Sequence, residues 1–213
     1  MLAFGLAEFS LAETVGVPRA ALATTLVCLA SFTIEWVGVH HGFLFGEYTY
    51  SANLGPRVGG VPVAIACAWM SLIVIGWGFT PSSFSIIGGW TVSAVLTTSL
   101  DLLIDPVASG PLHDWTWIHP GGFYGVPWRN FLVWLLATLL LQFPMSYLGR
   151  PAIPPTILWL LFTTLAGMFG LIGVIHHLWI PPLLGTVPVV LAGMAARFTK
   201  FRPSETPGTS IRV

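Results

Sequence analysis

The sequence predicts an all-α protein, a polytopic bundle of transmembrane helices with about six spans and a possible interfacial helix at the N-terminus. Of the 213 residues, 55% are hydrophobic and only 8% are charged. A soluble domain carries about 25% charged residues, so this chain cannot keep a water-facing surface on all sides. Several segments also approach the roughly 20 apolar residues that a bilayer requires. These observations place the chain in a membrane.

The spans can be assigned in chain order from the apolar runs. An N-terminal segment, Leu2–Val17, is short and is interrupted by Glu8, which favours an interfacial helix or a poor first span. Pro106 is expected to end the third span, and prolines should bend the later helices. The six predicted spans are Ala20–Val39, Gly59–Phe79, Phe84–Ile104, Asn130–Leu148, Thr156–Ile175 and Leu178–Phe198.

The domain organisation follows from length and composition. Residues 1–201 are expected to form a single transmembrane helical domain, and the polar, Pro- and Gly-rich residues 202–213 a disordered tail. A net charge of zero argues against nucleic acid as a partner. Cys28 and Cys67 lie inside apolar runs and are expected to be small core residues, without a disulfide or a metal framework.

Basic residues predict the orientation in the membrane. With six spans, one side holds Arg19, Arg150, Arg197, Lys200, Arg202 and Arg212, and the other side holds only Arg57 and Arg129. We therefore expect an integral protein of a prokaryotic cell membrane with both termini in the cytoplasm. All six histidines and five of the eight acids fall on or next to the side with few basic residues. One membrane face is thus predicted to hold the functional site.

A weak internal similarity accompanies this segregation. Glu35 is followed by His41-Gly42-Phe43 and by Gly60-Val61-Pro62, and Asp101 is followed by His119-Pro120-Gly121-Gly122-Phe123 and by Gly125-Val126-Pro127. The similarity is explained either by a parallel two-helix repeat whose acids meet at its interface, or by the abundance of Gly, Pro and Phe in this chain.

Asp101 and Asp105 are the strongest candidates for chemistry. They lie four residues apart at the end of an apolar run, so their side chains face the same way on a helix. A carboxylate in hydrocarbon costs roughly 2.5–3.5 kcal/mol on insertion scales, which makes such acids functional candidates. A low dielectric and a neighbouring like charge favour the neutral acid, which is suited to general-acid catalysis. The alternative is that Asp105 caps a turn or pairs with Arg57 or Arg129. For these two arginines, which are unusual on the side with few basic residues, pairing with the acids is the expected use.

The other candidates carry open alternatives. Glu35 is either a further catalytic acid or the buried partner of Arg57 or a histidine, and Glu47 is nearly as well explained by solvent exposure. The loop histidines lack the clustered motifs of membrane di-iron oxygenases, so water positioning or proton relay is favoured over a metal site. The aromatic loop residues either anchor the protein at the membrane interface or stabilise a cation.

Several motifs taken together resemble the CruF-type carotenoid biosynthesis membrane proteins. The resemblance covers roughly residues 35–134. It is carried by Glu35-Trp36-Val37-Gly38, Phe45-Gly46-Glu47-Tyr48-Thr49-Tyr50, Leu54-Gly55-Pro56-Arg57, Gly60-Val61-Pro62, Ala68-Trp69-Met70, Asp101-Leu102-Leu103-Ile104-Asp105-Pro106, Trp115-Thr116-Trp117, Gly122-Phe123-Tyr124-Gly125-Val126-Pro127 and Asn130-Phe131.

The resemblance implies a cofactor-independent hydro-lyase of the carotenoid 1,2-hydratase or bisanhydrobacterioruberin hydratase kind. Such an enzyme adds water across the terminal C1=C2 bond of a ψ end group, by acid protonation to a tertiary cation and capture of water. The expected substrates are carotenoids like lycopene, γ-carotene or bisanhydrobacterioruberin. The alternatives are a histidine-rich, metal-dependent membrane hydroxylase and a proton-coupled isoprenoid or lipid carrier.

The site residues follow from these arguments. Asp101, Asp105 and Glu35 are the predicted catalytic acids, and no metal ligand is assigned. The residues predicted to bind substrate or water are His41, Glu47, Tyr48, Arg57, Trp117, His119, Tyr124, Arg129 and Asn130.

Overall fold

The computed structural model describes residues 1–80, 84–149, 156–186 and 188. It is a helical bundle, as the sequence predicts. Its six complete α-helices in the described ranges are α1 (Leu2–Val15), α2 (Val17–His41), α3 (Val63–Gly78), α4 (Ile86–Ser109), α5 (Trp128–Ser146) and α6 (Thr156–Ile175). Residues 180–186 are also helical, but most of the predicted span Leu178–Phe198 and the predicted disordered tail 202–213 lie outside the described residues.

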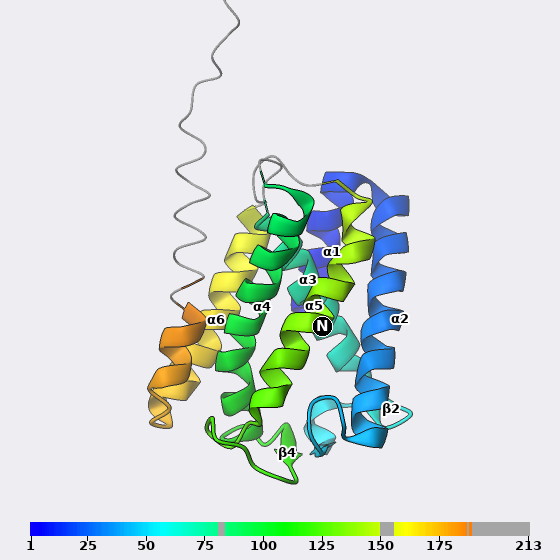
Figure 1. Ribbon diagram of the computed structural model, residues 1–213. Coiled ribbons are helices and arrows are strands. Elements are labelled where there is room, and N and C mark those ends of the chain that lie inside the picture. The colour runs from blue at the N-terminus through cyan, green and yellow to red at the C-terminus, as the bar shows by residue number, and fades with distance from the viewer. Residues whose placement is uncertain (81–83, 150–155, 187, 189–213) are drawn as a thin grey trace, which may run out of the picture.

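The helices stand side by side with their loops at two ends (Figure 1). Helices α2, α5, α4 and α6 follow one another from right to left in this view, and α1 and α3 lie behind them. Helix α1 packs against α2, α3 and α6, and its residues Ala7 and Leu11 are fully buried. The possible interfacial helix is thus a member of the bundle.

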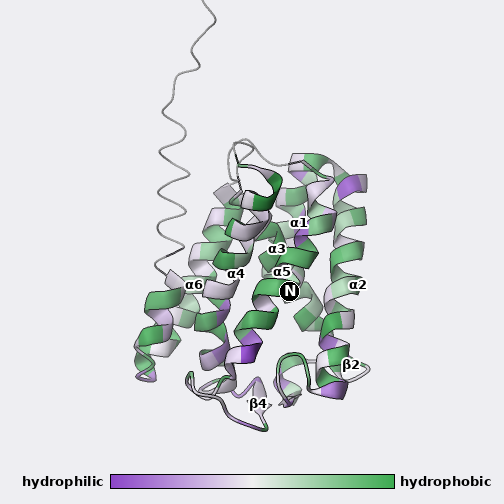
Figure 2. Ribbon diagram, viewed as in Figure 1, coloured by the Kyte–Doolittle hydropathy of each residue, from purple (hydrophilic) through white to green (hydrophobic). Residues whose placement is uncertain are grey.

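Among the described residues, three helices, α2, α4 and α6, are long and apolar enough to cross a membrane by length and composition, and α3 is apolar but shorter. Hydrophobic residues cover the helices on most sides, while hydrophilic ones gather mainly at the lower end (Figure 2). The orientation with cytoplasmic termini stays a prediction. Cys28 and Cys67 are both free cysteines, and both are half-buried among apolar neighbours.

Two small sheets close the lower end of the bundle. Strand β1 (Tyr48–Tyr50) follows α2 and pairs antiparallel with β4 (Trp115–Trp117), which follows α4. A 3₁₀ turn (Ala52–Leu54) leads to a hairpin of β2 (Arg57–Val58) and β3 (Val61–Pro62). The β1–β4 pairing therefore ties together two loops that are far apart in sequence.

Local sequence explains where these helices begin and end. Gly42 ends α2 in a left-handed conformation with a φ of 63°, and the Ser85 hydroxyl accepts a hydrogen bond at the start of α4. The expectation that Pro106 ends the third span is wrong, because α4 continues to Ser109. Proline removes a single N–H donor, and here the loss falls in the last turns of the helix.

All six histidines lie toward the lower end, as the sequence predicts. His40 and His41 end α2, His113 and His119 lie between α4 and α5, and the turn after α6 holds the remaining pair (Figure 1). The candidate acids are nearby, inside the lower part of the bundle.

Candidate active site

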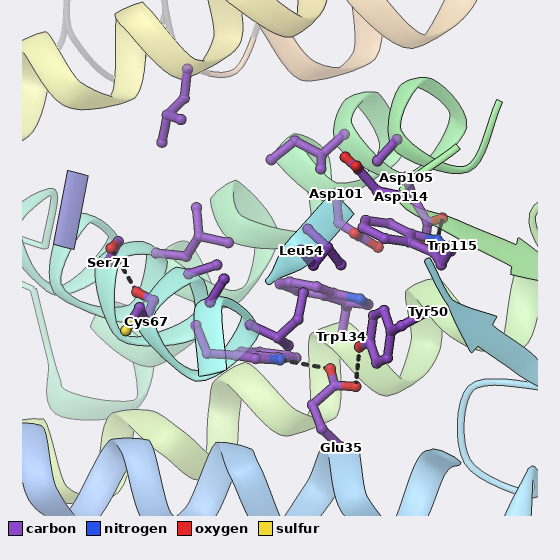
Figure 3. A pocket seen from close by; sticks show the side chains of 18 of the residues that line it. Glu35, Tyr50, Leu54, Cys67, Ser71, Asp101, Asp105, Asp114, Trp115 and Trp134 are labelled. Atoms are coloured by element: carbon purple, nitrogen blue, oxygen red, sulfur yellow. Dashed lines mark hydrogen bonds between the residues drawn. The ribbon is translucent and has the colours of Figure 1, made fainter. Parts of the chain in front are cut away.

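A cavity of about 290 Å³ lies inside the lower part of the bundle, between the helices and the strands β1 and β4. One part of its wall carries the acids Glu35, Asp101 and Asp105 (Figure 3). Apolar side chains from α1, α3 and α6, among them Phe4, Leu72, Leu165 and Phe169, form much of the remaining wall. The cavity is thus polar at one end and suited to a hydrocarbon at the other.

Asp101 and Asp105 face the cavity from successive turns of α4, as their spacing predicts. Their side chains are almost completely buried, with 1% and 2% of their surface exposed. Asn130, in the first turn of α5, joins them: its Nδ2 donates to Asp101 Oδ2 at 2.9 Å and to Asp105 Oδ2 at 2.7 Å. One amide group thus holds two carboxyl groups together.

Asp105 has further partners on β4. The indole N–H groups of Trp115 and Trp117 both donate to Asp105 Oδ1, at 2.9 and 3.2 Å. Alternate residues of a strand point to the same side, which explains why these two indoles reach one oxygen. Asp105 therefore accepts three N–H groups, whereas within the described structure Asp101 accepts only the one from Asn130.

Glu35 lies on α2 and is held by a second set of donors. The hydroxyls of Tyr48 and Tyr50 both donate to Glu35 Oε2, at 2.6 and 2.8 Å. The indole of Trp69 donates to Oε1 at 2.8 Å. Burial and the neighbouring Glu35 carboxyl raise the pKa of both tyrosine hydroxyls, which therefore keep their protons and remain donors.

Two stacked indoles separate the acid groups. The rings of Trp69 on α3 and Trp134 on α5 lie 3.9 Å apart between centroids, at an angle of 14°. Both line the cavity. In Figure 3 the Trp134 ring lies between Glu35 on one side and Asp101 and Asp105 on the other. An aromatic face is thus available next to the aspartates.

The structure brings together six of the predicted site residues: Glu35, Asp101, Asp105, Tyr48, Trp117 and Asn130 all line the cavity. The side chains of these six residues make most of the hydrogen bonds described above. The alternative role of Asp105 as a turn cap does not fit these hydrogen bonds. Among the described residues, the Asp105 carboxyl accepts hydrogen bonds only from side-chain N–H groups.

The other predicted residues lie outside the cavity wall. His41 is exposed beside Phe43, and Tyr124 contacts Phe123 at the loop surface. Glu47 and His119 form a solvent-exposed pair with 3.5 Å between Oε2 and Nε2. The prediction that these side chains contact the same site as the acids is therefore not met by their positions.

The predicted pairing of the arginines with the acids is wrong for the described structure. Arg57 donates to the backbone carbonyl of Tyr50 at 2.9 Å, and Arg129 donates to the carbonyl of Gly42 at 3.0 Å. Both side chains are exposed, and a guanidinium there keeps its hydration while it ties a loop together. The arginines thus stabilise loops, and the neutral donors Asn130, tryptophan and tyrosine serve the carboxyls.

Several cavity residues were not selected from the sequence as site residues. Trp69, Trp134, Tyr50, Trp115 and the half-buried Asp114 all line the cavity. A signal was present for the first two, because each is the seventh residue after a Gly-Val-Pro motif. In the ranges that the structure describes, no three His, Cys, Asp or Glu side chains are grouped so that they could hold a metal ion.

Sequence comparison relates the chain to known carotenoid biosynthesis proteins. A bisanhydrobacterioruberin hydratase from Haloarcula japonica is 34% identical over 143 residues, which is 62% of this chain and 47% of the relative. The chain thus spans about half the length of that relative. No solved structure matches the chain. The profile of the family described as carotenoid biosynthesis protein matches residues 1–192, and the chain therefore belongs to this family.

Proposed function

We propose that this protein is a carotenoid hydratase that adds water across the terminal C1=C2 bond of a ψ end group. The observation that carries the proposal is a buried pair of acids, Asp101 and Asp105, in the wall of a largely apolar cavity. Membership of a carotenoid biosynthesis family supports the substrate class, and the name of the Haloarcula japonica relative supports hydration. Carotenoids like lycopene, γ-carotene or bisanhydrobacterioruberin are the expected substrates.

The size of the cavity supports binding of one end of such a molecule. Pockets that enclose a whole drug-sized ligand measure about 300–1,000 Å³, and this cavity is at the lower limit of that range. A long polyene exceeds it, so only the end group is enclosed. The hydrocarbon chain would leave past the apolar side chains of α1, α3 and α6, toward the lipid.

Asp101 is the better placed proton donor of the pair. Hydrogen bonds from N–H groups stabilise the ionised form of a carboxyl group, and Asp105 accepts three of them. Asp101 accepts one such bond on Oδ2, and its Oδ1 has no hydrogen-bond partner in the described part of the chain. When the two carboxyl groups hold one proton between them, Asp101 therefore carries it and can deliver it to C2 of the substrate.

Protonation at C2 leaves a tertiary cation at C1, which the site can stabilise in two ways. The face of Trp134 turned toward the aspartates offers a cation–π contact, worth about 2 kcal/mol when desolvated. The Asp105 carboxylate supplies the opposite charge in a setting that excludes most water. Water then bonds to C1 and forms a tertiary alcohol.

The test is expression of the protein in a lycopene-producing host, followed by mass spectrometry of the extracted pigments. The proposal predicts carotenoids that have gained one water, and none in the same host expressing Asp101→Asn. The added oxygen should come from labelled water. Oxygen from dioxygen would instead support a hydroxylase, and unchanged pigment would support a carrier.

A further inference from the structure

The helix pairs α2–α3 and α4–α5 are built alike, as the Gly-Val-Pro similarity suggests. Both α3 and α5 begin after a proline with nearly the same backbone conformation: Pro62 has φ −65° and ψ 135°, and Pro127 has φ −66° and ψ 134°. A bridge between backbone segments precedes each proline, Val58 with Val61 in one case and Phe123 with Val126 in the other.

The turns inside these two bridges match as well. Gly59 and Gly60 have φ angles of 52° and 82°, and Tyr124 and Gly125 have φ angles of 51° and 87°. Two consecutive positive φ angles define a type I′ turn, which favours glycine. Tyr124 is therefore in a conformation that its counterpart Gly59 adopts without strain. The repeat thus extends to single backbone angles.

Equivalent residues of the two pairs also contact each other. Thr49 at the centre of β1 lies directly opposite Thr116 at the centre of β4. Trp69 and Trp134, each the seventh residue after its motif proline, form the indole stack. Contact between equivalent residues is expected where they lie next to a two-fold axis. A two-fold axis through the β1–β4 sheet and the indole stack accounts for both contacts.

The sequence similarity aligns Glu35 with Asp101, but the hydrogen bonds to the strands make Glu35 the counterpart of Asp105. Each carboxyl lies on the first helix of its pair and accepts bonds from two alternate aromatic residues of the strand that follows. For Glu35 these donors are Tyr48 and Tyr50, and for Asp105 they are the two indoles of β4. Both carboxyls line the same cavity, on opposite sides of Trp134 in Figure 3.

The α2–α3 half, which holds Glu35, and the α4–α5 half, which holds Asp105, differ in the groups that donate hydrogen bonds to these carboxyls. Indole and amide N–H groups only donate, whereas a tyrosine hydroxyl donates and also accepts. Glu35 Oε1 accepts a single bond, from Trp69, so a lone pair remains on that oxygen within the described structure. The Glu35 half can therefore take up a proton, either directly or through a tyrosine hydroxyl.

We propose that the two halves divide the reaction, with Glu35 as the general base that accepts the proton of the attacking water and Tyr50 as its relay. This proposal rests on the proposed function. Asp101 gives its proton to C2 as the C1=C2 π bond opens, and a water oxygen then bonds to C1. The proton released by that water passes to Glu35. Exchange through water in the cavity returns one proton from Glu35 to Asp101 and completes the cycle.

The test is a comparison of two readouts in deuterium oxide, the amount of tertiary alcohol and the deuterium at C2 of the recovered alkene. In Glu35→Gln the alcohol should fall by at least about 10²-fold, because a general base contributes 10²–10⁴-fold. Deuterium should still enter the alkene, since Asp101 can protonate C2 and take a proton back. Glu13→Gln, which changes an exposed acid of α1 that has no place in the site, should behave as the unchanged protein.

Hydration by Glu35→Gln at the unchanged rate would overturn the proposal, and so would loss of both readouts in a variant that keeps its helical circular dichroism. If Glu35→Gln does not fold, Tyr50→Phe gives the same test, because it removes only the relay hydroxyl: alcohol should fall while exchange persists. Exchange and hydration in Asp101→Asn would contradict the assignment of Asp101 as the proton donor. Absence of any hydrated carotenoid from the unchanged protein would contradict the proposed function instead, whatever the result for Glu35.

Discussion

Asn130 donates its side-chain amide to Asp101, with 2.9 Å between Asn130 Nδ2 and Asp101 Oδ2. The same nitrogen serves Asp105, and both acids and the amide are at most 2% exposed. Burying two carboxyl groups side by side is costly unless they share protons and donors. Asn130 therefore positions the acid pair on which the proposed chemistry depends.

Replacing Asn130 by leucine, whose side chain has the same branched shape and the same number of non-hydrogen atoms, should remove this donor and leave the fold of α5 intact. Loss of one preorganised donor to a catalytic charge costs about 10²–10³-fold in rate, and we expect a fall of that size in hydration. The measurement is the initial rate in detergent-solubilised membranes. Asn53→Leu, a change at an exposed asparagine, is the matched control and should leave the rate unchanged. An Asn130→Leu rate equal to the control would show that the amide has no part in the reaction.

Trp134→Leu should slow hydration more than Trp134→Phe does. A cation–π contact contributes about 0.5–2 kcal/mol, so removing the aromatic face should lower the rate by about 2- to 30-fold. Phenylalanine retains a weaker aromatic face at the same place. Trp128→Leu is the control, because that indole lies at the outer end of the same helix and is 61% exposed. Equal rates for the two Trp134 variants would contradict cation stabilisation by this ring.

Arg57→Met and Arg129→Met should change the hydration rate by no more than about twofold. Both guanidinium groups are exposed and bond backbone carbonyls, and surface changes of this kind are usually within ±0.5 kcal/mol. The rate per folded protein is measured, with the folded amount taken from size-exclusion chromatography. A loss of 10²-fold in a folded variant would instead point to a direct interaction of that arginine with the acids or the substrate.

Gly125→Ala should lower thermal stability, whereas Gly167→Ala should not. Neither position has a heavy atom within 4 Å of an added Cβ, so the two differ in backbone conformation and not in space. Gly125 has a φ of 87°, where alanine costs about 1 kcal/mol or more, while Gly167 is helical. Thermal unfolding in detergent measures the difference. Equal melting temperatures would mean that the turn before Pro127 relaxes without cost.

The helices and the acid pair were predictable because their signals are local. Apolar length marks the helices, and the four-residue spacing of Asp101 and Asp105 determines that they share a face. The inward faces of the helices were less predictable, since apolar residues cover a membrane helix all round. Stacking of Trp69 on Trp134 therefore did not follow from periodicity and needed the repeat to be recognised.

The donors to the acids were predicted in part. Asn130, Tyr48 and Trp117 were selected as binding residues, and all three donate to a carboxyl. The arginines were expected in this role because opposite charges attract. The structure satisfies the buried carboxyls with neutral groups and leaves the guanidiniums in the loops, where they avoid the cost of desolvation. Which loop residues reach inward depends on the β1–β4 pairing, which is not encoded in either loop alone.

The most direct test of acid catalysis by Asp101 is hydration of an acyclic carotenoid in oxygen-labelled water, with unchanged protein and Asp101→Asn at equal folded amounts. The unchanged protein should give a tertiary alcohol that carries the label at C1, and the variant should give none. Labelled alcohol from Asp101→Asn at a comparable rate would contradict the account.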